Sequence, residues 1–282
     1  MKIPEPKHSI SNSIDKWFED NVNDGKRFHM GASLIGEKCE RKLWMIFRFC
    51  KDEEFPGRIL RLFERGQDEE LKVVRNLERI GCTLEHTGED QYRVNLGSHV
   101  SGSLDGIITS GLQGAPKSKH ILEIKTHSKK SFDSLVKDGV LKSKPLHYVQ
   151  MQTYMYGTGI DRALYYAVCK DDDRIYTERF ELDVETAEYA IERAQRIATQ
   201  DELPPPITTN KTWWECKFCN FNGFCHQDEE ITNKNCRTCA YSTAKEDSTW
   251  FCEKHESTIP EENQVEGCEK YEKHYHLVKD KK

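Results

Sequence analysis

Apolar residues recur at roughly helical spacing in the first third of the chain. From Ile10 to Val22 they mark a predicted packing helix without chemistry, which Asn23-Asp24-Gly25 would end. Ser33 is a candidate N-cap for a second helix, with Glu37 in support. A longer amphipathic helix is predicted over residues 59–81, with Gly81 as its stop. Its apolar side would be Leu60, Phe63, Leu71, Val74, Leu77 and Ile80.

The middle of the chain changes to the spacing of β-strands. Residues 83–126 predict three strands, interrupted at Gly88, at Gly97-Ser98 and by the turn residues of 110–115. A helix is then predicted from Lys144-Pro145 to about Tyr156, stopped by Gly157 and Gly159. A continuous apolar strand over 163–169, an alternating strand over 174–182 and a helix over 187–198 follow.

Two of these strands carry charged side chains that can meet. Residues 101–108 and 121–126 both predict strands, and alternation places Glu123 and Lys125 on the same face. If the two strands pair, Asp105 lies beside them. Carboxylate oxygens and the Ile124 carbonyl suit magnesium or manganese, and Lys125 could orient or deprotonate a water. The pattern favours metal-assisted phosphodiester hydrolysis, but spacing alone fits a hairpin with ordinary surface charges equally well.

The eleven cysteines point to metal rather than to disulfides, because seven of them cluster between Cys216 and Cys268. Three closely spaced thiols, Cys216, Cys219 and Cys225, require a fourth ligand. Cys39 would complete a four-thiolate iron–sulfur set, whereas His226 would complete a zinc site. The remaining cysteines, Cys50, Cys82 and Cys169, are predicted to be inert thiols.

A second set follows, in which a Cys-x-x-Cys pair precedes a spaced second pair. This is a zinc signature with five candidates for four places. We assign Cys236, Cys239, Cys252 and Cys268 to the metal, with His255 as the substitute for Cys268. Zinc would fold a segment that is too polar to bury a core of its own.

Composition and charge restrict the class of protein. The 282 residues can bury one sizeable core and a smaller appendage. No apolar run approaches the roughly 20 residues that span a bilayer, and residues 1–7 lack the apolar centre of a signal peptide, so a cytoplasmic protein is expected. The net charge of −6 does not favour nucleic acid. Local basic groups could contact phosphates or form a solvated face: Arg58, Arg61, Arg65, Lys125, His127, Lys129 and Lys130.

Taken together, these elements resemble the PD-(D/E)XK nuclease superfamily over most of the chain. Asp105 fills the Asp position and Glu123-Ile124-Lys125 the E-x-K position, while Leu104 stands where the family name has Pro. Residues 65–70 are similar to the upstream Gly-x-x-x-(His/Glu) element of RecB-like and lambda-exonuclease-like members. Residues 150–154 are similar to the Gln-x-x-x-Tyr helix of the same groups, and the order helix, three strands, helix, strand also matches.

The resemblance implies roles for individual residues. Glu70, Asp105 and Glu123 would bind Mg²⁺ or Mn²⁺, and Lys125 would activate the water. Gln150 and Tyr154 would contact DNA or steady the lysine. An alignment shifted by one position would make Glu69 the ligand instead of Glu70.

The N-terminal cysteine extends the resemblance to nucleases with an iron–sulfur cluster. Cys39, Arg41, Leu43 and Trp44 are similar to the Cys-x-Arg-x-Leu-(Trp/Tyr) element of such enzymes. The AddB-type helicase–nucleases and the CRISPR-associated adaptation nucleases join one upstream cysteine to a downstream group. By resemblance, Cys39, Cys216, Cys219 and Cys225 would hold a structural [4Fe–4S] cluster.

The sequence therefore predicts an α/β protein with a restriction-endonuclease-like core, a mixed central sheet flanked by helices, over 83–200. Residues 1–82 would form a helical segment carrying Cys39 and Glu70, 201–230 the iron–sulfur clamp, and 231–282 the zinc module and tail. The expected function is a DNA exonuclease in recombination, repair or phage DNA metabolism, with a recombinase or single-strand-binding protein as a candidate partner. The alternative is a noncatalytic DNA- or protein-binding module. Polarity, strand preference and oligomeric state stay open.

Overall fold

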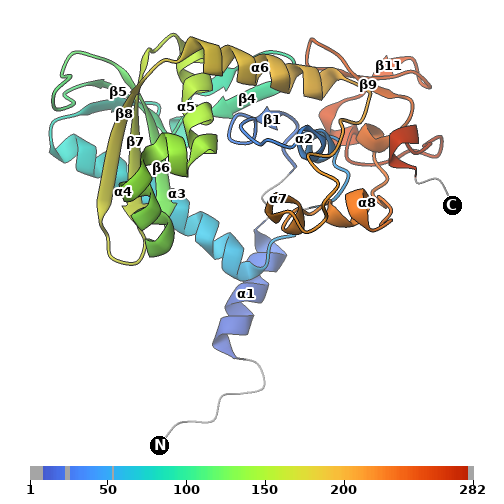
Figure 1. Ribbon diagram of the computed structural model, residues 1–282, viewed down its shortest axis with the longest axis horizontal. Coiled ribbons are helices and arrows are strands. Elements are labelled where there is room, and N and C mark those ends of the chain that lie inside the picture. The colour runs from blue at the N-terminus through green and yellow to red at the C-terminus, as the bar shows by residue number, and fades with distance from the viewer. Residues whose placement is uncertain (1–8, 23–25, 53, 279–282) are drawn as a thin grey trace, which may run out of the picture.

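A five-stranded mixed sheet forms the centre of one half of the molecule (Figure 1). The computed structural model describes residues 9–22, 26–52 and 54–278. The strand order is β2-β5-β6-β7-β8, and the strands are β2 (Thr83–Glu85), β5 (Gly106–Ser110), β6 (His120–His127), β7 (Arg162–Cys169) and β8 (Ile175–Glu181). Within this sheet, β6 and β7 pair in parallel and the other described neighbours pair antiparallel. Because a parallel pair needs a crossover, α4 (Lys129–Ser143) and α5 (Pro145–Thr158) connect them.

Alternation along β6 divides its side chains between two apolar clusters. Leu122 and Ile124 face α3 (Gly57–Arg79), which contributes Val73 and Leu77 to the same cluster. Ile121 faces the opposite side, where α4, α5 and α6 (Val184–Thr199) bury their apolar positions. Glu123 and Lys125 share the face of Ile121. They therefore point toward α5 within a sheet that is covered on both sides.

A second sheet and the C-terminal segments form the other half of the molecule (Figure 1). The second sheet has the order β1-β4-β3, and the C-terminal sheet the order β11-β10-β9. Their strands are β1 (Met30–Gly31), β3 (Arg93–Asn95), β4 (Val100–Ser103), β9 (Ser242–Ala244), β10 (Trp250–Cys252) and β11 (Ser257–Thr258). The helices of this half are α2 (Glu40–Phe47), α7 (Trp214–Lys217) and α8 (Asn222–His226). Among the described residues there are also 3₁₀ turns: η1 (Gly88–Asp90), which follows β2, and η2 (Cys236–Thr238), η3 (Glu261–Asn263) and η4 (Tyr275–Leu277) in the C-terminal segment.

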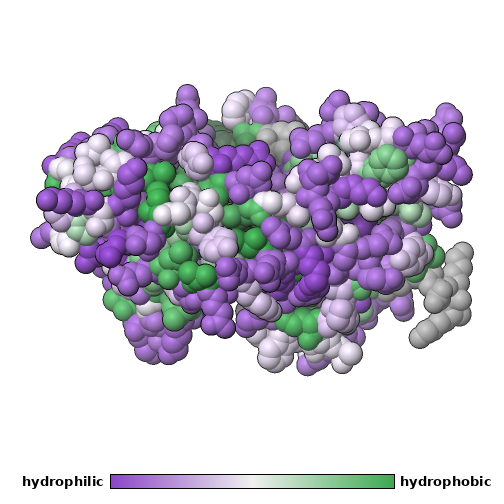
Figure 2. Space-filling model, turned by 90° about the horizontal axis from the view of Figure 1, so that it is seen from above, coloured by the Kyte–Doolittle hydropathy of each residue, from purple (hydrophilic) through white to green (hydrophobic). Residues whose placement is uncertain are grey.

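The two halves share one continuous apolar core. The cluster that begins beneath the five-stranded sheet continues through α2 to Trp250 and Leu277. Figure 1 shows α6 lying across both halves, and Arg193 of α6 donates to the Glu40 carboxylate at 2.9 Å and to the Glu37 carbonyl at 2.7 Å. From above, the surface is mostly hydrophilic, with apolar residues concentrated over the half that contains the large sheet (Figure 2). None of the described helices combines the length and apolar character that crossing a bilayer requires.

Helix α1 (Ile10–Asn21) projects away from the rest of the molecule (Figure 1). None of its described residues is buried, and it packs on α3, where Asp15 pairs with Arg61 at 2.8 Å. The predicted packing helix is thus present, but its apolar residues, with Trp17 56% exposed, contribute nothing to the core. The predicted stop at residues 23–25 lies outside the described residues.

Several predicted elements differ from the structure. Residues 101–108 form two strands in different sheets, broken at Leu104-Asp105, and residues 83–126 contain five strands instead of three. Helix α4 was not predicted; its helical pattern is interrupted at Gly139, whose φ is 71°. Ser33 is not an N-cap, because residues 32–36 are turns after β1 and α2 begins after Cys39.

The ends of two predicted helices also need correction. Gly157 lies inside α5, and only Gly159, in the left-handed region, ends that helix. In α3 and at its C-cap the predicted apolar side is only partly buried: Leu60, Val74 and Leu77 are buried. Phe63, Leu71 and Ile80 are 41%, 49% and 68% exposed.

Two buried arginines connect the C-terminal segment to α2. Arg237 donates to the carbonyls of Phe47 and Phe28, each at 2.7 Å, and to Gln264 Oε1 at 2.7 and 2.9 Å. Its guanidinium also lies over the Phe49 ring, 4.3 Å from the centroid. Arg48 donates to the Arg237 carbonyl at 3.2 Å. Burial lowers the pKa of Arg237 to about 9, so the group remains charged at neutral pH.

Replacing Arg237 by lysine tests this connection. Because an ammonium cannot reach all three acceptors in a planar fork, we expect Arg237→Lys to lower the free energy of unfolding by about 2–4 kcal/mol. Urea denaturation would measure the change. Arg79→Lys, an exposed residue that donates to Asn76, is the matched control and should change stability by less than about 0.5 kcal/mol. Equal losses in the two variants would contradict the account.

Candidate active site

The break between β4 and β5 places Asp105 beside β6. Gly106 pairs with Leu122 and Ile107 with Ile121 in the antiparallel register, so Asp105, one residue before β5, comes opposite Glu123. The Asp105 Oδ2 atom accepts a hydrogen bond of 2.6 Å from the Ile124 amide. This bond fixes the carboxylate where the β5–β6 pairing ends. The amide and carbonyl of one strand residue point to the same side, so the Ile124 carbonyl is directed to this same edge.

Glu123 and Lys125 form an ion pair on the face of β6 that points toward α5. Glu123 is fully buried, whereas the Lys125 side chain is 27% exposed. Burial raises the pKa of Glu123 to about 7, although Lys125 opposes the shift. Burial also raises the pKa of Asp105. The two carboxylates hold the pKa of Lys125 above its ordinary value despite burial, so the site contains a lysine ammonium.

Glu70 reaches the same cluster from α3. Burial, and then the Asp105 charge, raises the pKa of Glu70 to about 7, and Lys125 opposes this. Gln91 Nε2 lies 3.4 Å from Glu70 Oε2. Glu69 points elsewhere, because its carboxylate accepts from Lys72 at 3.2 Å. The structure therefore brings Glu70, and not Glu69, beside Asp105 and Lys125; its role as a ligand stays a prediction.

Gln150 and Tyr154 lie on the buried side of α5, against this cluster. Gln150 Nε2 lies 3.4 Å from the Tyr154 hydroxyl. Burial, and then the Glu123 charge, raises the pKa of Tyr154. Strand β4 passes so close that a Cβ atom on Gly102 would meet the Tyr154 hydroxyl, and it would lie 2.9 Å from the Ala32 Cβ. Gly102 thus leaves the space that the Tyr154 ring occupies.

A second hydrogen-bond network beside the cluster was missed by the sequence analysis. Tyr165 of β7 pairs in register with Glu123, and its hydroxyl lies 2.9 Å from His127 Nε2 and 2.8 Å from His147 Nδ1. Burial lowers the pKa of His127 to about 4 and that of His147 to about 3, and Lys125 adds to both shifts. Only the parallel β6–β7 register could have revealed this neighbourhood.

The basic residues proposed for phosphate contact separate into two groups. His127 is buried, so it neither contacts a phosphate at the surface nor belongs to a solvated face. Arg61 pairs with Asp15, Arg65 donates to the Lys170 carbonyl and Lys129 pairs with Asp133, all at exposed positions. Arg58 and Lys130 are also exposed.

The donor set at the carboxylate cluster fits a hard divalent cation. Apart from the ion pair with Lys125, neither oxygen of the buried Glu123 carboxylate has a hydrogen-bond partner among the residues described. Buried polar atoms in proteins nearly always have partners, and carboxylate oxygens are the ligands that magnesium and manganese prefer. Across residues 9–22, 26–52 and 54–278, however, no three His, Cys, Asp or Glu side chains are already arranged to hold a metal ion.

The four cysteines of the first set come together from distant parts of the sequence. Cys39 is the N-cap of α2, Cys216 lies in α7, Cys219 lies in the link between α7 and α8, and Cys225 lies in α8. All four line one small pocket, which His226 also lines. After burial, the charges of Cys39, Cys219 and Cys225 raise the pKa of Cys216. The pocket thus contains every candidate that the sequence suggested for this set.

The second cysteine set lines a separate cavity of about 330 Å³. Cys236, Cys239, Cys252, Cys268 and His255 all contribute to its wall. Cys268 Sγ lies 3.7 Å from His255 Nε2. Cys50, Cys82 and Cys169 lie outside both pockets and are buried.

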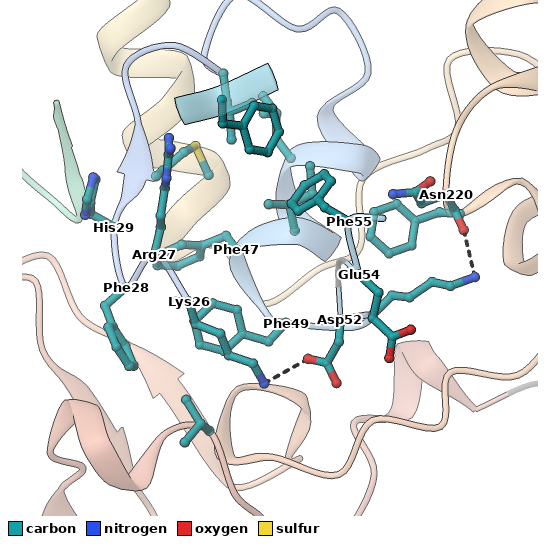
Figure 3. Close-up of a pocket in the computed structure, with 18 of the residues that line it drawn as sticks. Lys26, Arg27, Phe28, His29, Phe47, Phe49, Asp52, Glu54, Phe55 and Asn220 are labelled. Carbon is teal, nitrogen blue, oxygen red and sulfur yellow. Dashed lines mark hydrogen bonds and ion pairs between the residues drawn. The ribbon is translucent and has the colours of Figure 1, made fainter. Parts of the chain in front are cut away.

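A further cavity of about 1250 Å³, shown in Figure 3, is lined by none of the predicted site residues. Aromatic rings from the segments around α2 and charged side chains line it together. Lys26 pairs with Asp52 at 2.9 Å, and Lys51 donates to the Asn220 carbonyl at 3.3 Å. Because carboxylates balance its described cations, this cavity has no basic character that would favour nucleic acid.

Comparisons with known proteins found likeness only among solved structures; no family model and no curated protein matches the chain. A structure described as SSO0001 has a TM-score of 0.46 at 16% identity and covers 77% of this chain and 95% of its own. An alkaline exonuclease from Laribacter hongkongensis, also solved with dAMP, has a TM-score of 0.45 at 18% identity and covers 64% of this chain and 89% of its own.

A phage related exonuclease from Haemophilus somnus 129PT has a TM-score of 0.39 at 16% identity and covers 69% of this chain and 88% of its own. With TM-scores below 0.5, these likenesses do not assign a function to the chain. The residues of the site provide the basis for the functional proposal.

Replacing Gly102 by alanine tests the packing of the site. Because the new Cβ would displace Tyr154 or Ala32, we expect Gly102→Ala to destabilise the fold by about 1–3 kcal/mol. Gly66→Ala is the control, since a Cβ there meets nothing within 4 Å; it should stabilise α3 by about 0.5–1 kcal/mol. Thermal unfolding of both variants would measure the difference. A stable Gly102→Ala protein would show that β4 does not constrain Tyr154.

Proposed function

We propose that the protein is a metal-dependent DNA nuclease of the PD-(D/E)XK type, acting as an exonuclease on DNA ends. The observation that supports this most strongly is the convergence of Glu70, Asp105, Glu123 and Lys125 on one edge of a sheet that is packed on both faces. These residues come from a helix, a strand break and a strand. The noncatalytic alternative gives no reason for Glu123 to be buried with Lys125 as the one described partner of its carboxylate.

Glu70, Asp105 and Glu123 would hold Mg²⁺ or Mn²⁺, with the Ile124 carbonyl as a further oxygen. When bound, such an ion polarises the phosphodiester and acidifies a water molecule. Lys125 keeps its charge beside Glu123 and is partly exposed, so its ammonium would donate a hydrogen bond that orients the attacking water. Gln150 and Tyr154 would maintain the position of this face of the site, since both are buried against it.

We also propose that Cys39, Cys216, Cys219 and Cys225 hold a structural [4Fe–4S] cluster, as the resemblance implies. The four thiols share one pocket, and their soft donor chemistry suits such a cluster. Arg193 holds the segment before Cys39 through the carbonyls of Ile35 and Glu37. The cluster would join α2 to α7 and α8. A role in recombination, repair or phage DNA metabolism, with a recombinase or single-strand-binding protein as partner, rests on the resemblance.

Cleavage of end-labelled linear DNA tests the nuclease proposal. We expect wild-type protein to degrade DNA from its ends with Mg²⁺ or Mn²⁺ and not with EDTA. Lys125→Ala should lower the rate by at least about 10²-fold, because the hydrogen bond that orients the attacking water is lost, and Asp105→Ala should abolish cleavage. Lys142→Ala, which removes an exposed lysine paired with Asp138, is the control and should cleave normally. A folded, metal-loaded protein that cleaves neither single- nor double-stranded DNA would support the binding module instead.

Metal content tests the cluster proposal separately. Anaerobically purified protein should be brown and contain about four iron atoms per chain in the first set. Cys39→Ser should lose iron and colour, whereas Cys82→Ser, a buried thiol outside the set, should keep both. Colourless wild-type protein with zinc in place of iron would assign this pocket to zinc, with His226 in place of Cys39, and would leave the nuclease proposal intact.

A further inference from the structure

The second cysteine set occupies a cavity of its own in the C-terminal segment. Cys236 opens the η2 turn and Cys239 follows it, Cys252 ends β10, and Cys268 lies in the loop that leads to the last residues. The cavity of about 330 Å³ that they line lies apart from the carboxylate cluster and from the Cys39 pocket. None of these residues has a part in the proposed nuclease chemistry.

Local geometry holds the first two thiols together. The Cys239 amide donates to the Cys236 carbonyl at 3.1 Å, and Asn235 and Thr238 form a reciprocal capping box around the same turn. A tight Cys-x-x-Cys turn that directs two sulfurs at one point is the usual half of a zinc site. Cys252 and Cys268 line the same cavity as this turn.

Two exposed residues of the cavity, Cys268 and His255, are candidates for the single fourth ligand position. Cys268 Sγ and His255 Nε2 are 3.7 Å apart. In a tetrahedral zinc site, with Zn–S of about 2.3 Å and Zn–N of about 2.0–2.1 Å, two ligand atoms lie about 3.6 Å apart. The two atoms are therefore close enough that one ion position lies within ligand distance of either, and three cysteines leave one place for one of them. Both residues are exposed, whereas Cys239 is buried and Cys236 and Cys252 are half-buried.

We propose that this cavity is a structural zinc site in which Cys236, Cys239 and Cys252 are fixed ligands and Cys268 and His255 are interchangeable fourth ligands. Either residue can complete a tetrahedral set, because the two side chains lie 3.7 Å apart in the wall of the same cavity. The proposal does not depend on nuclease activity.

The position of Arg237 indicates what a metal ion at this site would stabilise. Arg237 lies inside the Cys236-x-x-Cys239 turn and extends into the core, where it donates to the Phe47 and Phe28 carbonyls. A zinc ion would fix the turn and so fix the base of this buried cation. The segment buries few apolar residues of its own, chiefly Ala244, Trp250, Ile259 and Leu277, so metal binding would supply much of its folding free energy.

The zinc content of full-length variants tests the ligand assignment. Each value is compared with that of the wild-type protein, so that any metal in the Cys39 pocket contributes equally to both. Cys268→Ser and His255→Ala should each retain the wild-type zinc content. The double variant should hold about one zinc fewer per chain. Cys268→Ser combined with His86→Ala is the matched control, since His86 is a half-buried histidine that pairs with Asp90 outside the cavity, and this variant should keep its zinc.

Loss of zinc in either single variant would overturn the interchange, and unchanged zinc in the double variant would overturn the site. If the double variant does not fold, chelation of the wild-type protein provides the second measurement. Removal of one zinc per chain should lower the unfolding temperature and increase amide hydrogen exchange around Arg237 and Phe47. Removal that leaves both unchanged would contradict the structural role.

Discussion

The hydrogen bond from the Ile124 amide to the Asp105 carboxylate is the point on which the site depends. It forms where the chain leaves the β1-β4-β3 sheet and enters the five-stranded sheet. If residues 101–108 formed one uninterrupted strand, Asp105 would be an ordinary paired strand residue whose side chain projects from one face of the sheet. The break instead frees its side chain to bond the neighbouring strand, opposite Glu123. The position of Gly102 beside Tyr154 follows from the same change of sheet.

Buried charge is treated differently in the two halves of the molecule. Arg237 is enclosed by two backbone carbonyls, a glutamine oxygen and aromatic rings, so each nitrogen of its guanidinium has a hydrogen-bond acceptor. Glu123 is buried just as deeply, but only Lys125 meets its charge. A satisfied buried charge is explained by structure alone, whereas an incompletely satisfied one indicates a functional site. This contrast separates the arginine that holds the fold from the carboxylate that we propose as a metal ligand.

The sequence was informative where the signal is local. The spacing of Glu123 and Lys125 along one strand, the pairing of Asp105 with that strand, the helix with Gln150 and Tyr154 and the grouping of the cysteines all follow from short-range periodicity or motif spacing. The strand break at Leu104-Asp105, the kinked helix α4 and the place of Tyr165 opposite Glu123 depend on pairing between distant segments. The burial of Arg237 could not be read either, because Cys-Arg-Thr-Cys gives no sign that its arginine enters a core.

The most direct measurement of the central claim is Mn²⁺ binding to the DNA-free protein, followed by titration calorimetry or electron paramagnetic resonance. The account predicts one shared site, so Glu70→Gln, Asp105→Asn and Glu123→Gln should each weaken Mn²⁺ binding. Glu69→Gln should leave it unchanged, because Glu69 pairs with Lys72 outside the cluster. Equal binding by wild type and all three variants, or weakening by Glu69→Gln alone, would contradict the assignment of these carboxylates to a metal.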